Sequence, residues 1–368
     1  MLEYLRFPVE ASRGRRYPEP GHAYRNPFQR DRDRIIHTRA FRRLENKTQV
    51  FSPALSDHFR NRLTHTLEVT QIARTIASAL GLNEDLTEAL ALVHDVGHPP
   101  FAHAGEDELD RQIRKFGARF DHNIQSLRIV ESLEQRYPRF PGLNLTFEVR
   151  EGIVKHSRDF EPGEIPELDE YLPGQRPVLE AQIIDLADEI AYNAADLDDA
   201  YEAEFLTPEL VAESVPLYAE ILDVVDTQFP GASPRERFQE SVRHLIDELV
   251  SGLIQGSVAA VKDSGVSDFE AVRHYPTRLI RFTRPIAETS AALKRCLFEN
   301  VYASDILAED RRQSTVLLCR TFEYLIEHPE KVPGFEGSGR FLPRAVCDFI
   351  SGMTDRYFLR YYENLFGS

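Results

Sequence analysis

Residues 94–106 read His-Asp-Val-Gly-His-Pro-Pro-Phe-Ala-His-Ala-Gly-Glu and form the densest cluster of polar groups in the chain. The apolar pattern before them predicts a helix over about 84–97, with Asn83 as its N-cap and a pair of prolines after it. His94 and Asp95 therefore stand at the C-terminal end of an otherwise buried helix. Burying an imidazole and a carboxylate without partners is costly. A divalent cation would satisfy both, because neutral imidazole and carboxylate are its usual ligands.

A second amphipathic helix is predicted to precede this one. Its apolar residues recur at three- and four-residue steps, namely Leu63, Leu67, Ile72, Ala73, Ile76, Ala77 and Leu80. Gly81 follows the last of them as a stop signal. His65 lies just beside this apolar stripe, so a second imidazole is expected near the same core.

A third predicted helix, much later in the chain, carries Asp188 within its apolar face. Together with His65, His94 and Asp95 it makes a set of two imidazoles and two carboxylates. Such a set binds a divalent metal and leaves coordination positions open for water and a phosphate oxygen. Asp185 lies one helical turn before Asp188 and is a rival ligand that spacing alone leaves open.

The composition is that of a soluble globular protein, with 368 residues of which 42% are hydrophobic and 28% charged. No stretch approaches the roughly 18 apolar residues that a membrane span requires. The N-terminal residues lack the apolar core of a secretory signal, so none is expected. The cysteines, Cys296, Cys319 and Cys347, are far apart, which predicts small buried side chains in a reducing cytoplasm.

Charge is unevenly distributed along the chain. Residues 1–50 contain 11 arginines and one lysine against six acidic residues, a net charge of +6. The rest of the chain carries −22, because the total is −16. A basic segment on an acidic chain indicates a local anion site. Salt bridges within the segment, or an oligomer contact, would explain it as well.

The fold is predicted to be all-α, since we find no internal repeat and no convincing strand-like alternation. Residues 1–30 are rich in proline and are predicted to form an extended N-terminal arm. The core is predicted over 31–208 and includes a helix from Val178. Residues 209–368 are expected to form further helices packed on that core, without a firm boundary, and 209–340 carry few motifs.

With these motifs the chain resembles a known family, the HD superfamily, and within it the dGTPase-like deoxynucleoside triphosphate triphosphohydrolases. The matching stretches keep the family's order from about residue 12 to 357, so the resemblance covers nearly the whole chain. They are Gln29–His37, Ala40–Leu44, Lys47–Phe51, Arg62–His65, His94–Glu106, Phe120–Arg128, Glu151–His156, Asp188–Tyr192 and Gly352–Arg356. The resemblance implies an HD-domain helical core with additional C-terminal helices.

The resemblance implies that four side chains are the family's metal ligands: His65, His94, Asp95 and Asp188. It further implies that His103 and Glu106 are the catalytic pair beside the α-phosphate. Their spacing of three residues agrees, because one helical turn lets the carboxylate orient the imidazole and raise its basicity. His103 could then transfer a proton during attack by water or departure of the ester oxygen.

Phosphate binding is also implied by the resemblance. His98 and His122 look like phosphate-side histidines, and Arg62 looks like a phosphate clamp, a role that a bidentate guanidinium suits. An ion pair of Arg62 with Glu68 or another acid is the alternative. Two more cations are expected to add positive charge: Lys155 and Arg356.

Three residues on one face of the third predicted helix are candidates for binding the sugar. Asp188, Tyr192 and Asp196 stand at i, i+4 and i+8 and therefore share a face. By resemblance, Asp196 and Gln49 would bind the 3′-hydroxyl, and Tyr192 would leave no room for a 2′-hydroxyl. The family often has a histidine after the tyrosine, where this chain reads Asn-Ala-Ala-Asp over 193–196, so the preferred base stays open.

The function implied is metal-dependent hydrolysis of dGTP or several deoxynucleoside triphosphates at the α-phosphate, giving a deoxynucleoside and tripolyphosphate. One alternative is another HD phosphohydrolase, such as a nucleotidase or a phosphodiesterase. A second is a protein that binds single-stranded nucleic acid and carries a vestigial HD site, which the arginines of 25–43 motivate.

The expected cofactor is a divalent cation, and the ligand set suits Mn²⁺, Mg²⁺, Fe²⁺ or Zn²⁺. The expected partners are the dNTP substrate and further copies of the chain in a homo-oligomer. A dNTP activator and weak binding of single-stranded nucleic acid are open, and no membrane partner is expected.

Overall fold

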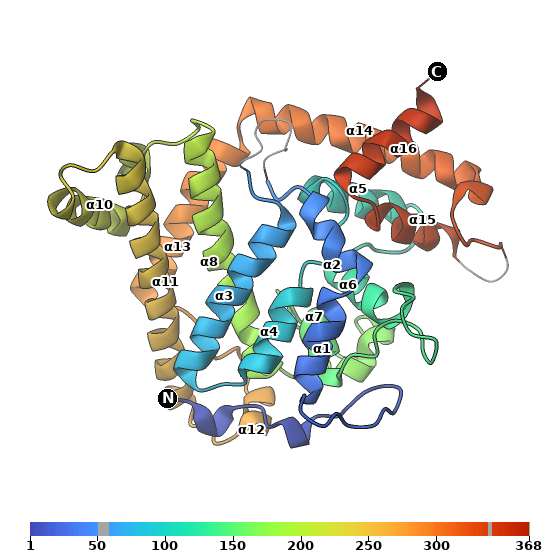
Figure 1. Cartoon of the computed structure of the whole chain (residues 1–368), viewed down its shortest axis with the longest axis horizontal. Coiled ribbons are helices and arrows are strands. Elements are labelled where there is room, and N and C mark those ends of the chain that lie inside the picture. The colour runs from blue at the N-terminus through green and yellow to red at the C-terminus, as the bar shows by residue number, and fades with distance from the viewer. Residues whose placement is uncertain (51–58, 338–340, 368) are drawn as a thin grey trace. The chain divides into compact units, whose positions relative to one another are not determined.

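The computed structural model describes residues 1–50, 59–337 and 341–367, and over these ranges the chain is built of helices (Figure 1). The helices that the structure describes are α1 to α16 together with short 3-10 and π-helical segments. Extended pairing in the same ranges is limited to isolated bridges, such as the one between Arg15 and Thr146. The prediction of an all-α fold is therefore confirmed.

Two compact units make up the chain. Unit 1 comprises Met1–Arg13, Leu67–Ala91 and Lys155–Leu307. Unit 2 comprises Gly14–Thr66, Leu92–Val154 and Ala308–Ser368. Three helices run from one unit into the other: α3 (Arg62–Leu80), α4 (Glu84–Val93) and α14 (Asp305–Glu327).

Parts of α3, α4 and α14 belong to unit 1. Its other helices are η1 (Glu3–Leu5), η2 (Val9–Ala11), η5 (Pro166–Tyr171), α8 (Leu179–Glu202), α9 (Pro208–Ser214), α10 (Pro216–Gln228), α11 (Pro234–Ser264), α12 (Phe269–Arg273), α13 (Arg284–Leu297) and η6 (Phe298–Tyr302). Unit 2 contains α1 (Pro27–Ile36), α2 (Arg39–Arg43), η3 (Leu44–Asn46), α5 (Ala102–Arg114), α6 (His122–Arg128), the π-helical η4 (Ile129–Leu133), α7 (Phe147–Val154), η7 (Pro329–Lys331), α15 (Leu342–Ser351) and α16 (Asp355–Phe366).

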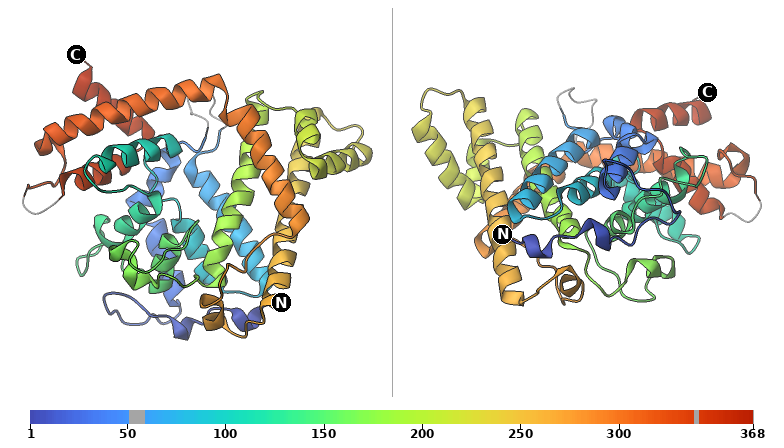
Figure 2. Two further views of the ribbon diagram at one scale, coloured as in Figure 1. Left: turned by 180° about the vertical axis from the view of Figure 1, so that it is seen from behind. Right: turned by 60° about the horizontal axis from the view of Figure 1, so that its bottom comes forward.

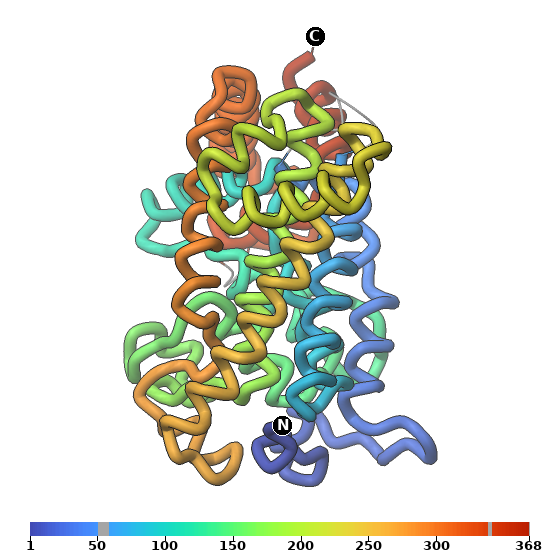
Figure 3. Tube along the Cα trace, turned by 90° about the vertical axis from the view of Figure 1, so that its left-hand side faces the viewer, coloured from blue at the N-terminus to red at the C-terminus, as the bar shows by residue number. Residues whose placement is uncertain are grey.

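Unit 1 is organised around three long helices, α8, α11 and α13, which pack on one another (Figures 1 and 2). The longest, α11, begins with a capping box between Ser233 and Glu236 and ends at Gly265, whose φ of 68° favours glycine. Gly256 permits close packing, since a Cβ there would lie 2.4 Å from the carbonyl oxygen of Arg281. The short helices α9 and α10 pack on each other and α10 packs on α11, as Figure 3 shows.

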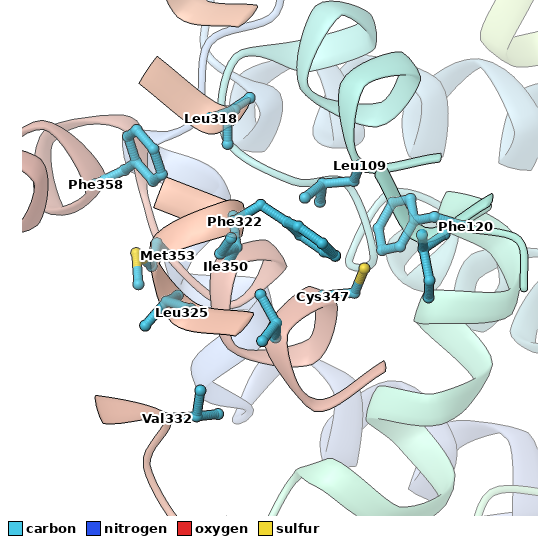
Figure 4. Close-up of a cluster of buried hydrophobic side chains, with 12 residues drawn as sticks. Leu109, Phe120, Leu318, Phe322, Leu325, Val332, Cys347, Ile350, Met353 and Phe358 are labelled. Carbon is cyan, nitrogen blue, oxygen red and sulfur yellow. The ribbon is translucent and has the colours of Figure 1, made fainter. Parts of the chain in front are cut away.

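Unit 2 has a hydrophobic core between the C-terminal helices and α5 (Figure 4). Leu109 of α5 and Phe120, which precedes α6, are buried together with Phe322 of α14. The helices α15 and α16 add Ile350 and Phe358 to the same cluster. This core fixes the C-terminal helices against the segment that carries residues 94–106.

The basic N-terminal segment is largely paired within unit 2. Arg34 holds the carboxylate of Glu19 at 2.9 and 2.8 Å, and Arg15 lies 2.5 Å from Asp31. Both acids belong to residues 1–50, so these pairs leave the net charge of +6 unchanged. Salt bridges within the segment are present, and the anion site and the oligomer contact stay predictions.

Two local predictions were wrong. Leu67 was predicted on the apolar stripe of α3, but it is 51% exposed, and Val69 is buried instead. The helix α4 ends at Val93 rather than near residue 97, because the following residues form a tight turn that ends in two prolines. The other residues of the α3 stripe from Ile72 to Leu80 are buried as predicted.

Two expectations from composition can be compared with the structure. Cys296 and Cys347 are buried, Cys319 is half-buried, and all three are free thiols. Over the described ranges, we find no helix whose length and apolar character would let it cross a membrane.

We expect Phe322→Ala to lower the stability of the chain by about 3–5 kcal/mol, because it empties a large site in a close-packed core. Phe322 is 1% exposed, whereas Phe341 is 48% exposed and serves as the matched control. Phe341→Ala should cost roughly 0.5 kcal/mol or less. Thermal and urea denaturation of the two variants measures the difference, and equal losses would show that the cluster does not stabilise unit 2.

Candidate metal and phosphate site

The ligand candidates of unit 2 lie where helices begin and end. His65 is in the first turn of α3, and His94 and Asp95 follow the last residue of α4. All three are buried. A ring nitrogen of His65 lies within 4.8 Å of one of His94, and the ring centroids are 5.9 Å apart. The structure therefore brings together the two imidazoles that the sequence predicts as ligands.

The turn after α4 is held by α6. The hydroxyl of Ser126 accepts a hydrogen bond from the backbone N–H of Gly97 at 2.9 Å and donates to the carbonyl oxygen of His94 at 3.3 Å. A Cβ at Gly97 would lie 2.1 Å from the carbonyl oxygen of His122. Glycine is therefore needed here, because only its backbone can approach α6 this closely.

Asp95 is the centre of a network of cationic and imidazole groups. Its carboxylate lies 2.8 Å from Arg62 Nη1, 3.0 Å from His98 Nδ1 and 3.5 Å from His94 Nε2. Burial raises the pKa of Asp95, but His98, His94 and Arg62 outweigh burial and hold that pKa well below its usual range. Asp95 is therefore an ionised carboxylate, as a metal ligand must be.

Arg62 forms an ion pair with an acid, which is the alternative to a phosphate clamp. The acid is Asp95. Its Nε is buried without a hydrogen-bond partner among the described residues. A role as phosphate clamp stays a prediction.

His98, His122, His103 and Glu106 form a second cluster in unit 2. The rings of His98 and His122 stack with centroids 3.9 Å apart, and His122 Nδ1 lies 2.8 Å from Glu106 Oε1. Burial and the charge of Arg62 lower the pKa of His98 well below its usual range, so this imidazole is neutral at pH 7. Burial raises the pKa of Glu106, but His103 and His122 outweigh burial and lower it.

The expected pair of His103 and Glu106 is close but is longer than a hydrogen bond. His103 Nδ1 lies 3.8 Å from Glu106 Oε2, and its side chain is 80% exposed. Glu106 instead binds His122, which also donates its backbone N–H to Glu106 Oε1 at 2.9 Å. Sequence analysis missed this contact because 16 residues separate the two, and no helical spacing connects them.

In unit 1, the structure separates the two rival carboxylates of α8. Asp185 lies 2.7 Å from His156 Nδ1 and forms an ion pair with Arg278. Asp188 lies 3.9 Å from His156 Nε2. Since Asp185 is already bound to two partners, Asp188 is the better candidate for a metal ligand.

The sugar-side residues Tyr192 and Asp196 also lie on α8, and Asp196 is buried. The hydroxyl of Tyr302 donates a hydrogen bond to the carboxylate of Asp196. Burial and the charge of Asp196 raise the pKa of Tyr302, so this phenol stays protonated and remains a donor. Tyr302 was not identified from sequence, because it lies 106 residues after Asp196 with no motif to connect them.

The remaining candidates have different surroundings. Lys155 is buried and donates to the carbonyl oxygens of Leu172 and Gln175, both at 2.9 Å. Gln49 is half-buried, and Phe51, the last residue of its motif, lies outside the described residues. Arg356 is exposed and lines a cavity of about 650 Å³ in unit 2, together with other residues including Arg43, Lys47 and Arg360. Phosphate roles for Lys155 and Arg356 stay predictions.

Comparison with known proteins gives two family matches. The family described as HD domain matches residues 62–193, and the phosphohydrolase-associated domain matches residues 280–364. A protein of Geobacter sulfurreducens is 45% identical over 361 residues, which covers 96% of this chain and 92% of the relative. One of Ralstonia nicotianae is 44% identical over 358 residues, with the same shares covered. Both relatives are called deoxyguanosinetriphosphate triphosphohydrolase-like protein.

We expect Glu106→Gln to destabilise the metal-free chain by about 1–2 kcal/mol at pH 7, because a charge-assisted hydrogen bond to His122 is lost. The pKa of Glu106 is lower in the folded state than its unfolded value of about 4.3. Its stabilisation is therefore fully present above pH 4.3 and is lost as the pH falls below that value.

Urea unfolding of both proteins in EDTA from pH 7 to about pH 3 measures the effect. The stability difference between them should shrink as the pH falls below about 4.3. A constant difference across this range would contradict the contribution of an ionised Glu106.

Proposed function

We propose that this chain hydrolyses deoxynucleoside triphosphates at the α-phosphate. The proposal follows from its family, because the chain belongs to the HD-domain family of deoxyguanosinetriphosphate triphosphohydrolase-like proteins. Membership makes it a phosphohydrolase. The cleavage site and the products, a deoxynucleoside and tripolyphosphate, are part of the proposal. One observation in unit 2 supports it above all: the buried group of His65, His94 and Asp95 is joined through His98 to a second cluster of histidines around Glu106.

The side chains present fit a divalent metal. Two buried imidazoles have nitrogens within 4.8 Å of each other, and the neighbouring Asp95 is ionised. In the proposal, His65, His94 and Asp95 hold the cation, and Asp188 is the fourth ligand that the family pattern predicts. The bound cation would polarise a phosphate oxygen and supply an activated water. Mn²⁺, Mg²⁺, Fe²⁺ and Zn²⁺ all suit this donor set.

In the proposal, the second cluster binds phosphate and transfers protons. His98 and His122 would line the phosphate, since each has a ring nitrogen not used by its carboxylate contact. That nitrogen donates to a phosphate oxygen only when the imidazole carries a second proton. Glu106 stays ionised and fixes the orientation of His122. His103 is exposed, so its ring is accessible to substrate. It would accept a proton from the attacking water or give one to the departing ester oxygen.

The sugar end of the site is proposed on α8 with Gln49. Asp196 would accept a hydrogen bond from the 3′-hydroxyl, and Tyr302 holds that carboxylate through its own hydroxyl. Tyr192 would occupy the space next to C2′ and exclude a 2′-hydroxyl. The base preferred, a dNTP activator, a homo-oligomer and a cytoplasmic location stay predictions.

The first test is incubation of the protein, loaded with each of the four metals, with dNTPs singly and mixed. We expect tripolyphosphate and deoxynucleoside, resolved by ion-exchange chromatography, with activity abolished by EDTA. His65→Ala and His94→Ala should lower turnover by at least about 100-fold, because each removes a proposed metal ligand. His244→Ala, on α11, is the matched control and should leave turnover unchanged.

Other outcomes would identify another activity. Orthophosphate from a monophosphate, with no tripolyphosphate from any dNTP, would replace the proposal with a nucleotidase. Salt-sensitive binding of single-stranded nucleic acid without turnover of any nucleotide, metal present, would support a vestigial HD site.

Sugar selection provides a separate prediction. Tyr302→Phe removes the donor that holds Asp196, so the preference for a dNTP over its 3′-deoxy analogue should fall by roughly tenfold. Tyr192→Ala should admit ribonucleoside triphosphates. The control is Tyr218→Phe, a buried tyrosine of α10 with no proposed contact to substrate. The measurement is the ratio of kcat/KM values for paired substrates, and an unchanged ratio in Tyr302→Phe would remove Tyr302 from sugar selection.

A further inference from the structure

The carboxylate of Asp355 joins two backbone segments of unit 2. Asp355 is the first residue of α16. Its Oδ2 accepts the backbone N–H of Thr48 at 2.8 Å, and its Oδ1 accepts the backbone N–H of Phe101 at 3.1 Å. Thr48 directly precedes Gln49, and Phe101 directly precedes the helix that carries His103 and Glu106. One side chain near the C-terminus therefore contacts the chain next to both proposed substrate-binding segments.

The backbone at Phe101 is strained. Phe101 and Ala102 have φ values of 64° and 53°, a left-handed conformation that side chains other than glycine seldom adopt. Such a conformation is unfavourable for a residue with a Cβ, because the Cβ crowds the following carbonyl oxygen. No side chain caps the start of α5, where Phe101 is the N-cap residue. The hydrogen bond that Phe101 donates to Asp355 holds this turn in place, together with an edge-on contact with the ring of Phe358, 5.3 Å between centroids.

Lys47 makes a matching set of contacts beside Asp355. Its buried Nζ donates to the carbonyl oxygen of His98 at 2.5 Å and to that of Ser351 at 2.9 Å. Its own carbonyl oxygen accepts the backbone N–H of Arg62 at 3.1 Å. Burial lowers the pKa of Lys47 to about 7, although Asp355 raises it. Lys47 thus contacts the backbone of Arg62 and His98, two of the residues that contact Asp95. It connects both to Ser351, the last residue of α15.

We propose that Asp355 and Lys47 are positioning residues that clamp the turn from His98 to Ala102 against the C-terminal helices. The clamp would keep His98, His103 and Glu106 in their reacting positions and offset the strain at Phe101. Neither residue touches substrate in this proposal, which rests on the proposed function of the site. Proteins place strained residues at functional sites when the surrounding structure holds them firmly. A displacement of about 1 Å at such a site can cost about 100-fold in rate.

The main experiment compares Asp355→Ala with Asp110→Ala. Asp110 is a carboxylate of α5 that also accepts a backbone N–H, from Phe120 at 2.9 Å, but it contacts none of the proposed site residues. We expect both variants to lose similar thermal stability. Asp355→Ala alone should lose about 10- to 100-fold in kcat with KM nearly unchanged, because the misplaced groups act in the transition state. Metal content, measured by mass spectrometry, should stay at the level of the parent protein.

Two further variants test whether the clamp acts as a unit. Asp355→Asn keeps one acceptor oxygen and should retain activity between those of the parent and Asp355→Ala. Lys47→Met should lower kcat in the same way. The double variant Lys47→Met, Asp355→Ala should lose less than the product of the two single losses, since both changes release the same turn. Multiplicative losses would show that the two residues act independently.

A readout without substrate separates this proposal from the proposed function. Hydrogen exchange of residues 98–106 should speed up at least tenfold in Asp355→Ala and stay unchanged in Asp110→Ala. If the parent protein hydrolyses no dNTP, the proposed function fails, while faster exchange would still establish the clamp. Unchanged exchange over 98–106, or a kcat loss in Asp355→Ala no larger than that in Asp110→Ala, would overturn the clamp.

Discussion

The buried carboxylate of Asp95 is the constraint on which the rest of the site depends. An ionised carboxylate out of water is costly unless charges and hydrogen bonds compensate it. Here Arg62 and His98 provide that compensation at 2.8 and 3.0 Å. Those contacts fix the start of α3 and the turn after α4 relative to each other. The same start of α3 carries His65, so the arrangement that stabilises Asp95 also places the ligand candidates together.

Close backbone approach is the second requirement of the site. Gly97 meets the backbone of α6, and a Cβ at Gly105 would lie 1.9 Å from the carbonyl oxygen of Pro100. The turn can therefore fold back tightly, but only by placing Phe101 and Ala102 in left-handed conformations. Strain of this kind must be offset by contacts from elsewhere. In unit 2 those contacts come from α16.

The sequence predicted well what depends on local pattern, and it failed where contacts join distant segments. Helix periodicity predicted the all-α fold. The polar run 94–106 predicted His94 and Asp95 as ligands, and the apolar stripe of the preceding helix pointed to His65. Leu67 was misplaced because an apolar residue at a stripe position need not be buried. The bond between Glu106 and His122, and that between Asp196 and Tyr302, follow no helical spacing. They depend on tertiary packing, which a single sequence does not show.

Two residues of the C-terminal part of the chain make contacts with distant segments that local sequence pattern did not indicate. The matched phosphohydrolase-associated domain, residues 280–364, contains both Tyr302 and Asp355. In unit 1, Tyr302 holds the carboxylate of Asp196, and in unit 2, Asp355 holds the backbone before α5. Phe101 lies within the HD match, and Asp196 lies three residues after its end. In the proposed site, Tyr302 and Asp355 would orient other groups, since neither is a metal-ligand candidate.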